Sequence, residues 1–130
     1  MTDPGRASFD AELTSFIESA LPSVWALETL LVMRRNSDRT WPADALVTET
    51  RSSQNVMSDC LRTLERAGLI ARDADGYRYR PATPHMAELV ERLATTYAER
   101  PFGVTAVIMA RRSDALKGFA DSFRLGKGTS

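Results

Sequence analysis

The sequence predicts a mainly α-helical domain that contains one small β-hairpin. Apolar residues recur at spacings of three and four along most of the chain, which indicates amphipathic helices. The pattern changes after Gly68, where two short strand candidates are joined through Asp75-Gly76, a dipeptide typical of hairpin turns. A length of 130 residues, with 43% apolar and 26% charged residues, is ordinary for one globular domain.

The N-terminal part of the chain predicts two helices. Residues 1–8 are polar and are expected to form a loose N-terminus. The first helix begins at Phe9 and is ended by Pro22, and its apolar stripe comprises Phe9, Leu13, Phe16, Ile17, Ala20 and Leu21. Ser23 is a suitable cap for the second helix, because its hydroxyl can accept from a first-turn N–H. The inner face of that helix comprises Val24, Leu27, Leu30 and Leu31, with Trp25 toward one side.

A helix-turn-helix unit is predicted over residues 42–68. Thr40-Trp41 is a short strand candidate, and Pro42 fits the first position of a short helix that reaches about Glu49. The turn Thr50-Arg51 then leads to a second helix with a polar leading end.

The central helix spans residues 52–67, with Ser52 or Ser53 as its N-cap. Its apolar face comprises Val56, Cys60, Leu61, Leu64 and Ala67. Gly68 lies where a left-handed residue would end the helix. The hairpin that follows, residues 69–80, has predicted strands Leu69–Arg72 and Tyr77–Arg80, with Asp75-Gly76 in a type I′ turn.

More helices are predicted after the hairpin. One runs from His85 to about Glu99, and Arg100–Gly103 interrupts it. Val104, Val107 and Ile108 indicate another helix, which ends near residue 112 and closes the predicted domain, residues 9–112. Residues 113–130 are expected to form a C-terminal helix and tail, with the helix over residues 114–125.

The order of helix, glycine, strand and hairpin resembles the recognition helix and wing of winged helix-turn-helix proteins. The run Leu61-Arg-Thr-Leu-Glu-Arg-Ala-Gly-Leu-Ile70 is similar to the L-x-x-L-E-x-x-G-L-I run of MarR-type, PadR-type and ArsR-type bacterial regulators. The resemblance covers roughly the middle half of the chain. It implies a winged helix-turn-helix with flanking N- and C-terminal helices, which in dimeric regulators of this kind build the homodimer interface.

The charges are unevenly distributed, although the formal net charge is zero. A neutral total counts mildly against nucleic-acid binding, because phosphate binding usually requires a basic surface. Residues 1–30 carry one arginine and five acidic residues, which gives −4. Residues 51–80 carry six arginines and four acidic residues, which gives +2, and residues 100–130 give +4 from six basic and two acidic residues. The neutral total is therefore compatible with a basic face.

The leading turn of the central helix is the candidate base-reading element. Glutamine and asparagine can bond adenine edges in pairs, serine can bond base edges or phosphates, and an arginine further along can reach guanine or phosphate. Wing arginines can hold phosphates or the minor groove, whereas the wing-tip residues Asp73 and Asp75 weaken such contacts. Asp59 would repel phosphate unless it pairs with Arg62 or accepts a hydrogen bond from a cytosine amine. The candidate DNA-binding residues are Arg51, Ser52, Ser53, Gln54, Asn55, Ser58, Arg62, Arg72, Arg78 and Arg80.

The sequence gives little support for an enzyme. The single histidine, His85, lies at a helix start, where a capping or solvent role is expected. The single cysteine, Cys60, falls on an apolar stripe, so a buried hydrophobe is expected rather than a redox sensor. One cysteine allows no intramolecular disulfide and no cysteine-rich zinc site, and we expect no cofactor and no metal. The terminal Gly-Lys-Gly-Thr-Ser lacks the context of a phosphate loop.

Two functions remain open. The first is a sequence-specific double-stranded DNA-binding transcriptional regulator, a homodimer with helix 52–67 in the major groove and wing 69–80 on the backbone or minor groove. Half-sites would lie about 34–36 Å apart, and the MarR resemblance implies a possible small-molecule effector between the flanking helices and the winged unit. The alternative is a winged-helix protein–protein interaction module, indicated by the neutral charge, the acidic wing tip and the segment Phe119–Arg124. Without a signal segment or an apolar run near 18 residues, a cytoplasmic protein without membrane contact is expected.

Overall fold

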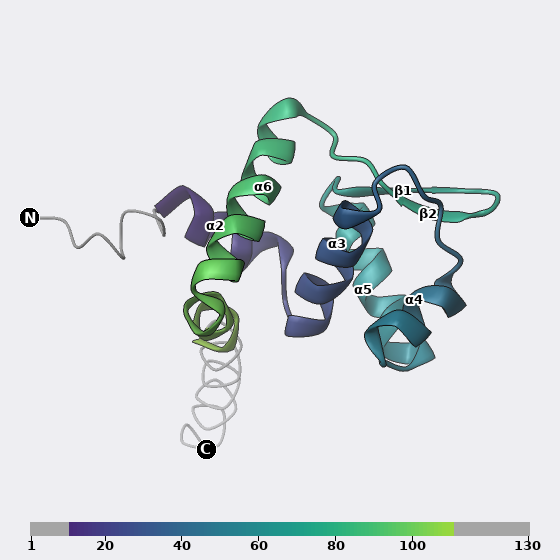
Figure 1. Ribbon diagram of the computed structural model, residues 1–130, viewed down its shortest axis with the longest axis horizontal. Coiled ribbons are helices and arrows are strands. Elements are labelled where there is room, and N and C mark those ends of the chain that lie inside the picture. Colours follow the sequence, from purple (N-terminus) through teal and green to yellow (C-terminus); the bar gives the residue numbers. More distant parts are fainter. Residues whose placement is uncertain (1–10, 111–130) are drawn as a thin grey trace, which may run out of the picture.

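The computed structural model describes residues 11–110, and this part of the chain is mainly helical with one antiparallel hairpin, as predicted. The elements in chain order are α2 (Ala11–Ala20), α3 (Val24–Arg35), α4 (Ala43–Thr50), α5 (Gln54–Arg66), β1 (Ile70–Asp73), β2 (Gly76–Tyr79), α6 (Pro84–Glu99) and a helix over Pro101–Ala110. Figure 1 shows α6 alongside α2, while α3, α4, α5 and the hairpin gather beside this pair.

Helix α2 buries the predicted stripe, and α3 is more deeply buried than predicted. Leu13, Phe16, Ile17 and Ala20 of α2 are buried, whereas Phe9 lies outside the described residues. Ser23 caps α3, and its Oγ accepts a 3.1 Å hydrogen bond from the Ala26 N–H. Burial extends around α3 to residues that the sequence did not single out, namely Ala26, Thr29, Val32 and Met33. The reason is that α3 packs against α4, α5 and β2 at once.

The hydrogen bonds that end α5 confirm the predicted role of Gly68. Its φ of +80° is left-handed, and its N–H donates to the Glu65 carbonyl at 3.0 Å. The Leu69 N–H donates to the Leu64 carbonyl at 3.1 Å. These two bonds form a Schellman motif, which satisfies carbonyls at the helix end and turns the chain into β1.

The hairpin forms where predicted, but the prediction of a type I′ turn at Asp75-Gly76 is wrong. The register pairs Asp73 with Gly76, so the two loop residues are Ala74 and Asp75. A type I′ turn needs positive φ at both loop residues, and among the described non-glycine residues only Arg51 has positive φ. The strands are consequently Ile70–Asp73 and Gly76–Tyr79, one residue away from the predicted bounds.

Gly76 is required for a different reason, which is the close approach of Trp41. A Cβ atom on Gly76 would lie 2.2 Å from the Trp41 carbonyl oxygen, and the glycine φ is +142°. The Trp41 N–H donates to the Tyr77 carbonyl at 2.7 Å, and the Tyr77 N–H donates to the Trp41 carbonyl at 2.8 Å. The predicted strand fragment at Thr40-Trp41 is thus an isolated antiparallel bridge that ties the hairpin to the chain before α4.

Two helix starts differ by one residue from the prediction. Pro42 is the N-cap of α4 rather than its first helical residue, and α4 begins at Ala43. Pro84, rather than His85, begins α6, because the Thr83 Oγ1 accepts a 3.1 Å hydrogen bond from the Met86 N–H and so caps the helix one residue earlier.

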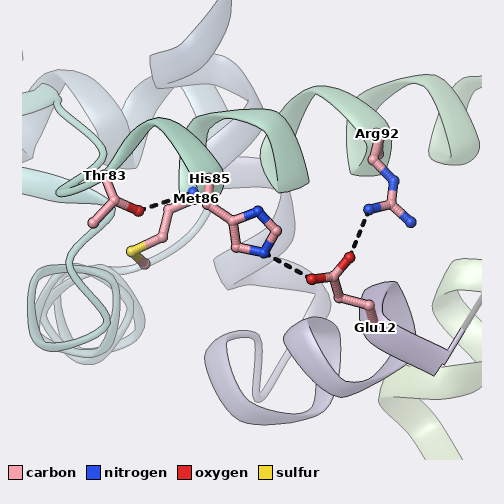
Figure 2. Close-up of polar contacts among 5 residues, drawn as sticks. All are labelled: Glu12, Thr83, His85, Met86 and Arg92. Carbon is pink, nitrogen blue, oxygen red and sulfur yellow. Dashed lines mark hydrogen bonds and ion pairs between the residues drawn. The ribbon is translucent and has the colours of Figure 1, made fainter.

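A polar contact joins α2 to α6 (Figure 2). The Glu12 carboxylate lies 2.7 Å from His85 Nε2 and accepts a 3.0 Å hydrogen bond from Arg92 Nη1. Hydrogen bonds from Arg92 and His85 lower the pKa of Glu12. Beneath this contact, Leu89, Val90 and Leu93 of α6 are buried.

The break after α6 is narrower than the predicted interruption. Helix α6 ends at Glu99 and the next helix begins at Pro101, since proline is favoured in the first helical turn. Val104 and Ile108 are buried, in agreement with the predicted apolar pattern. The predicted helix over residues 114–125 lies outside the described part of the chain.

Candidate nucleic-acid interface

The first turn of α5 uses two of the candidate serines for its own structure. Ser53 is the N-cap, and its Oγ accepts a 3.2 Å hydrogen bond from the Val56 N–H. The Ser52 hydroxyl is half-buried and accepts a 3.0 Å hydrogen bond from Thr50 Oγ1. Arg51 is exposed and has a left-handed φ of 57°, so the turn between α4 and α5 presents its side chain to solvent. Of these three candidates, Arg51 is the one left free to meet a ligand.

Gln54 is tied to the preceding helix. Its Nε2 donates a 2.7 Å hydrogen bond to the Asp44 carboxylate, so a base edge would have to compete with Asp44 for this amide. Asn55 and Ser58 are exposed on the same side of α5 and make no side-chain hydrogen bond to another described residue. The side chains of Asn55 and Ser58 are therefore open to a ligand without loss of a described hydrogen bond.

Arg62 forms an ion pair with Asp59 one turn earlier on the helix. Both side chains are well exposed, at 61% for Arg62 and 70% for Asp59. An exposed pair of this kind is weak, because water screens both charges. Arg62 therefore remains able to exchange its carboxylate partner for a phosphate or a guanine.

The wing does not place its three arginines on one face. Arg72 pairs with Tyr77 across the hairpin and Ala71 pairs with Arg78, and adjacent pairs point to opposite faces of a hairpin. Arg72 thus shares the face of the buried Ile70, although its own side chain is exposed. A hydrogen bond with Tyr77 raises the pKa of Arg72.

Arg78 and Arg80 share the outer face, because they are two residues apart. Arg80 is exposed and Arg78 is half-buried. At the tip, the Asp73 carboxylate accepts a 2.9 Å hydrogen bond from the Asp75 N–H, and both aspartates are exposed. The outer face of the wing therefore carries both basic and acidic groups.

The helix-turn-helix and hairpin together are electrically neutral. Residues 42–80 contain six arginines and six acidic residues, so the charge of +2 over residues 51–80 is cancelled by Asp44 and Glu49 of α4. Asp44, which the sequence did not single out, has the most direct effect, because it holds Gln54. Sequence spacing offered no signal for this contact between two helices.

Met57 was also missed, although the signal was present. It is 1% exposed and receives a 3.9 Å contact from the Thr29 hydroxyl at its sulfur. The buried face of α5 consists of Met57, Cys60, Leu61 and Leu64, while the predicted Val56 is half-buried. Spacings of three and four from Met57 describe this face better than the spacing from Val56.

Cys60 and His85, the two residues considered for a chemical role, both contact other parts of the fold. Burial raises the pKa of the Cys60 thiol, which favours its neutral form. His85 is exposed and bonded to Glu12. Over residues 11–110, no group of three or more His, Cys, Asp or Glu side chains is placed to hold a metal ion.

Nothing in the described residues forms a single helix long and apolar enough to cross a membrane. Comparison of the chain with protein-family models, with curated proteins and with solved structures finds no match.

Proposed function

We propose that this chain is a winged helix-turn-helix transcriptional regulator that binds double-stranded DNA sequence-specifically, with α5 as the recognition helix. The observation that carries the proposal is the two-sided character of α5. Its inner side is buried in the core, while its outer side exposes Asn55, Ser58 and Arg62. A major groove admits one helix, and side chains of these types can bond base edges and phosphates.

The contacts of the interface refine the roles of its residues. Asn55, Ser58 and Arg62 are assigned to base edges, and Arg51 at the preceding turn is assigned to a phosphate. Ser52, Ser53 and Gln54 shape the leading turn, with Gln54 reading a base only after it leaves Asp44. Arg78 and Arg80 on the outer face of the wing are assigned to the DNA backbone or minor groove, and Arg72 to a supporting contact with Tyr77.

The proposal includes a cytoplasmic homodimer that forms through the flanking helices. On the helix Pro101–Ala110, Phe102 is 86% exposed and Met109 is 53% exposed. Residues seven apart lie on the same side of a helix, so these two large side chains share one exposed apolar face. Burial of this face against a second copy would give the dimer two recognition helices, one for each half-site.

The proposal is tested by selecting a binding sequence from random duplexes and measuring affinity by fluorescence anisotropy at low and moderate salt. We expect tight, salt-dependent binding to the selected duplex. Loss of a base contact in Asn55→Ala or Arg62→Ala should weaken it by about 1–3 kcal/mol. Arg35→Ala is the matched control, because it removes an exposed arginine from the end of α3 and should change affinity little.

The result that contradicts the proposal is the absence of any binding at low salt by folded wild-type protein. Equal weakening by Arg35→Ala and Arg62→Ala would also contradict it. The binding would then depend on the total positive charge of the protein and not on specific contacts of α5.

A protein-interaction module is the second candidate function, and the neutral charge of residues 42–80 favours it. Protein binding through the apolar face of Phe102 would change little with salt, whereas DNA binding weakens steeply as salt rises. Salt-insensitive capture of a partner by wild type, lost in Phe102→Ser, would support this second function.

A further inference from the structure

A cavity of 330 Å³ opens between the turn before α3 and the side of α5. A volume of this size lies at the lower end of the range for small-molecule sites. Its lining residues are Pro22, Ser23, Trp25, Val56, Asp59, Cys60 and Thr63. The cavity thus touches the proposed recognition helix directly.

Most of the cavity wall is apolar or neutral. Trp25 is 41% exposed, so part of this large aromatic residue is accessible to a ligand. Cys60 lies at 4% exposure and forms a neutral, polarisable part of the wall. The Ser23 Oγ accepts a hydrogen bond from the Ala26 N–H as the cap of α3, and its O–H remains able to donate. A ligand would therefore gain most from contact with the Trp25 ring.

Asp59 is the one acidic or basic residue among the lining residues. It is 70% exposed and so lies at the rim, where it can meet a charged ligand without being buried itself. An aromatic face next to a carboxylate favours an organic cation, because the ring attracts a cation over its face and the carboxylate pairs with it. The same carboxylate repels an organic anion.

We propose that this cavity binds a small organic ammonium ion, whose charged group lies beside the face of Trp25 and pairs with Asp59. The contact has a consequence outside the cavity, because Asp59 also pairs with Arg62, which is not among the lining residues. A ligand cation competes with Arg62 for the carboxylate. Arg62 then loses its carboxylate partner and is free to contact DNA, so the ligand raises the affinity of the protein for DNA. This second step rests on the proposed function.

Binding is tested first without DNA, by isothermal titration calorimetry with 2-phenylethylamine. Phenylacetate and 2-phenylethanol are the anionic and neutral ligands of matched shape. We expect heat of binding with the amine, at least about tenfold weaker binding of the alcohol, and none of the anion. Asp59→Asn should weaken amine binding at least about tenfold. Glu65→Gln, an exposed carboxylate on the same helix outside the cavity, is the control and should leave it unchanged.

Trp25→Leu provides the second variant, because it keeps an apolar side chain at this half-exposed position and removes the aromatic ring. It should weaken amine binding while the folded state is retained by circular dichroism. The proposal is overturned if the amine does not bind, if the alcohol binds as tightly as the amine, or if Asp59→Asn binds the amine as wild type does.

The coupling to DNA is measured separately, as DNA affinity with and without saturating amine. We expect an increase of no more than about fivefold, because the exposed pair that the ligand breaks is weak. Amine binding without any change in DNA affinity would overturn the coupling and leave the cavity site standing. A protein that binds the amine but no DNA would instead refute the proposed function.

Discussion

Replacement of Gly76 by alanine tests whether the bridge between Trp41 and the hairpin fixes the wing. A Cβ atom at this position would lie 2.2 Å from the Trp41 carbonyl oxygen and 2.9 Å from the Pro42 nitrogen, so the backbone must move. Movement breaks the two hydrogen bonds between Trp41 and Tyr77, each of which contributes about 0.5–1.5 kcal/mol. The φ of +142° adds backbone strain of about 1–3 kcal/mol for a residue with a side chain.

The sum predicts a loss of about 2–6 kcal/mol from the free energy of unfolding, measured by urea denaturation with far-UV circular dichroism. Gly68→Ala is the matched control. Its Cβ would lie 3.3 Å from the Ala82 Cβ, at a φ of +80°, so it should cost only about 1–2 kcal/mol. A Gly76→Ala protein as stable as Gly68→Ala, or more stable, would refute the assignment of Gly76 to a close backbone contact.

Three other substitutions have expected outcomes. Tyr79→Phe removes a buried hydroxyl that has no hydrogen-bond partner among the described residues, so unfolding free energy should stay constant or rise by up to about 1 kcal/mol in the same denaturation assay. Glu12→Gln should lower the urea midpoint at neutral pH. Because hydrogen bonds from Arg92 and His85 lower the folded pKa of Glu12 below its ordinary value, this difference is present above the ordinary glutamate pKa and is lost as pH falls through the folded pKa. A difference that persists in acid would contradict the ionic role of Glu12. Asp44→Asn should raise affinity for non-selected DNA in anisotropy titrations, since it removes one negative charge and weakens the hold on Gln54; unchanged affinity would show that Asp44 lies away from the duplex.

Features set by neighbouring residues could be predicted from the sequence. Ser23 and Gly68 cap helices through bonds that span three to five positions, so the residue type and its place beside an apolar stripe carry the signal. The helical stripes of α2 and α6 are local in the same way, because one helix face repeats every three to four residues. These signals also supported the hairpin, although its turn geometry was wrong.

Features set by contacts between distant segments could not be predicted. The sequence indicated that Gly76 is a turn residue. In the structure, glycine is required there because the backbone of Trp41, which is far away in the sequence, lies close to it. Gln54 looked free at a helix start, but Asp44 of another helix holds it. The additional buried residues of α3, such as Thr29 and Met33, are covered because α4, α5 and β2 all pack against this helix. The sequence of α3 alone does not show this packing.

The neutral surface around α5 has a physical consequence for the proposed function. Asp44 and Asp59 already occupy Gln54 and Arg62 in the free protein, so a DNA site must offer more than phosphate charge to replace them. Random duplexes offer mainly phosphate charge, and a neutral surface binds them weakly. A duplex with matching base edges replaces the lost carboxylate contacts with paired hydrogen bonds. The carboxylates therefore reduce total affinity while they increase the difference between correct and incorrect sequences, and a ligand that occupies Asp59 would shift that balance toward tighter binding.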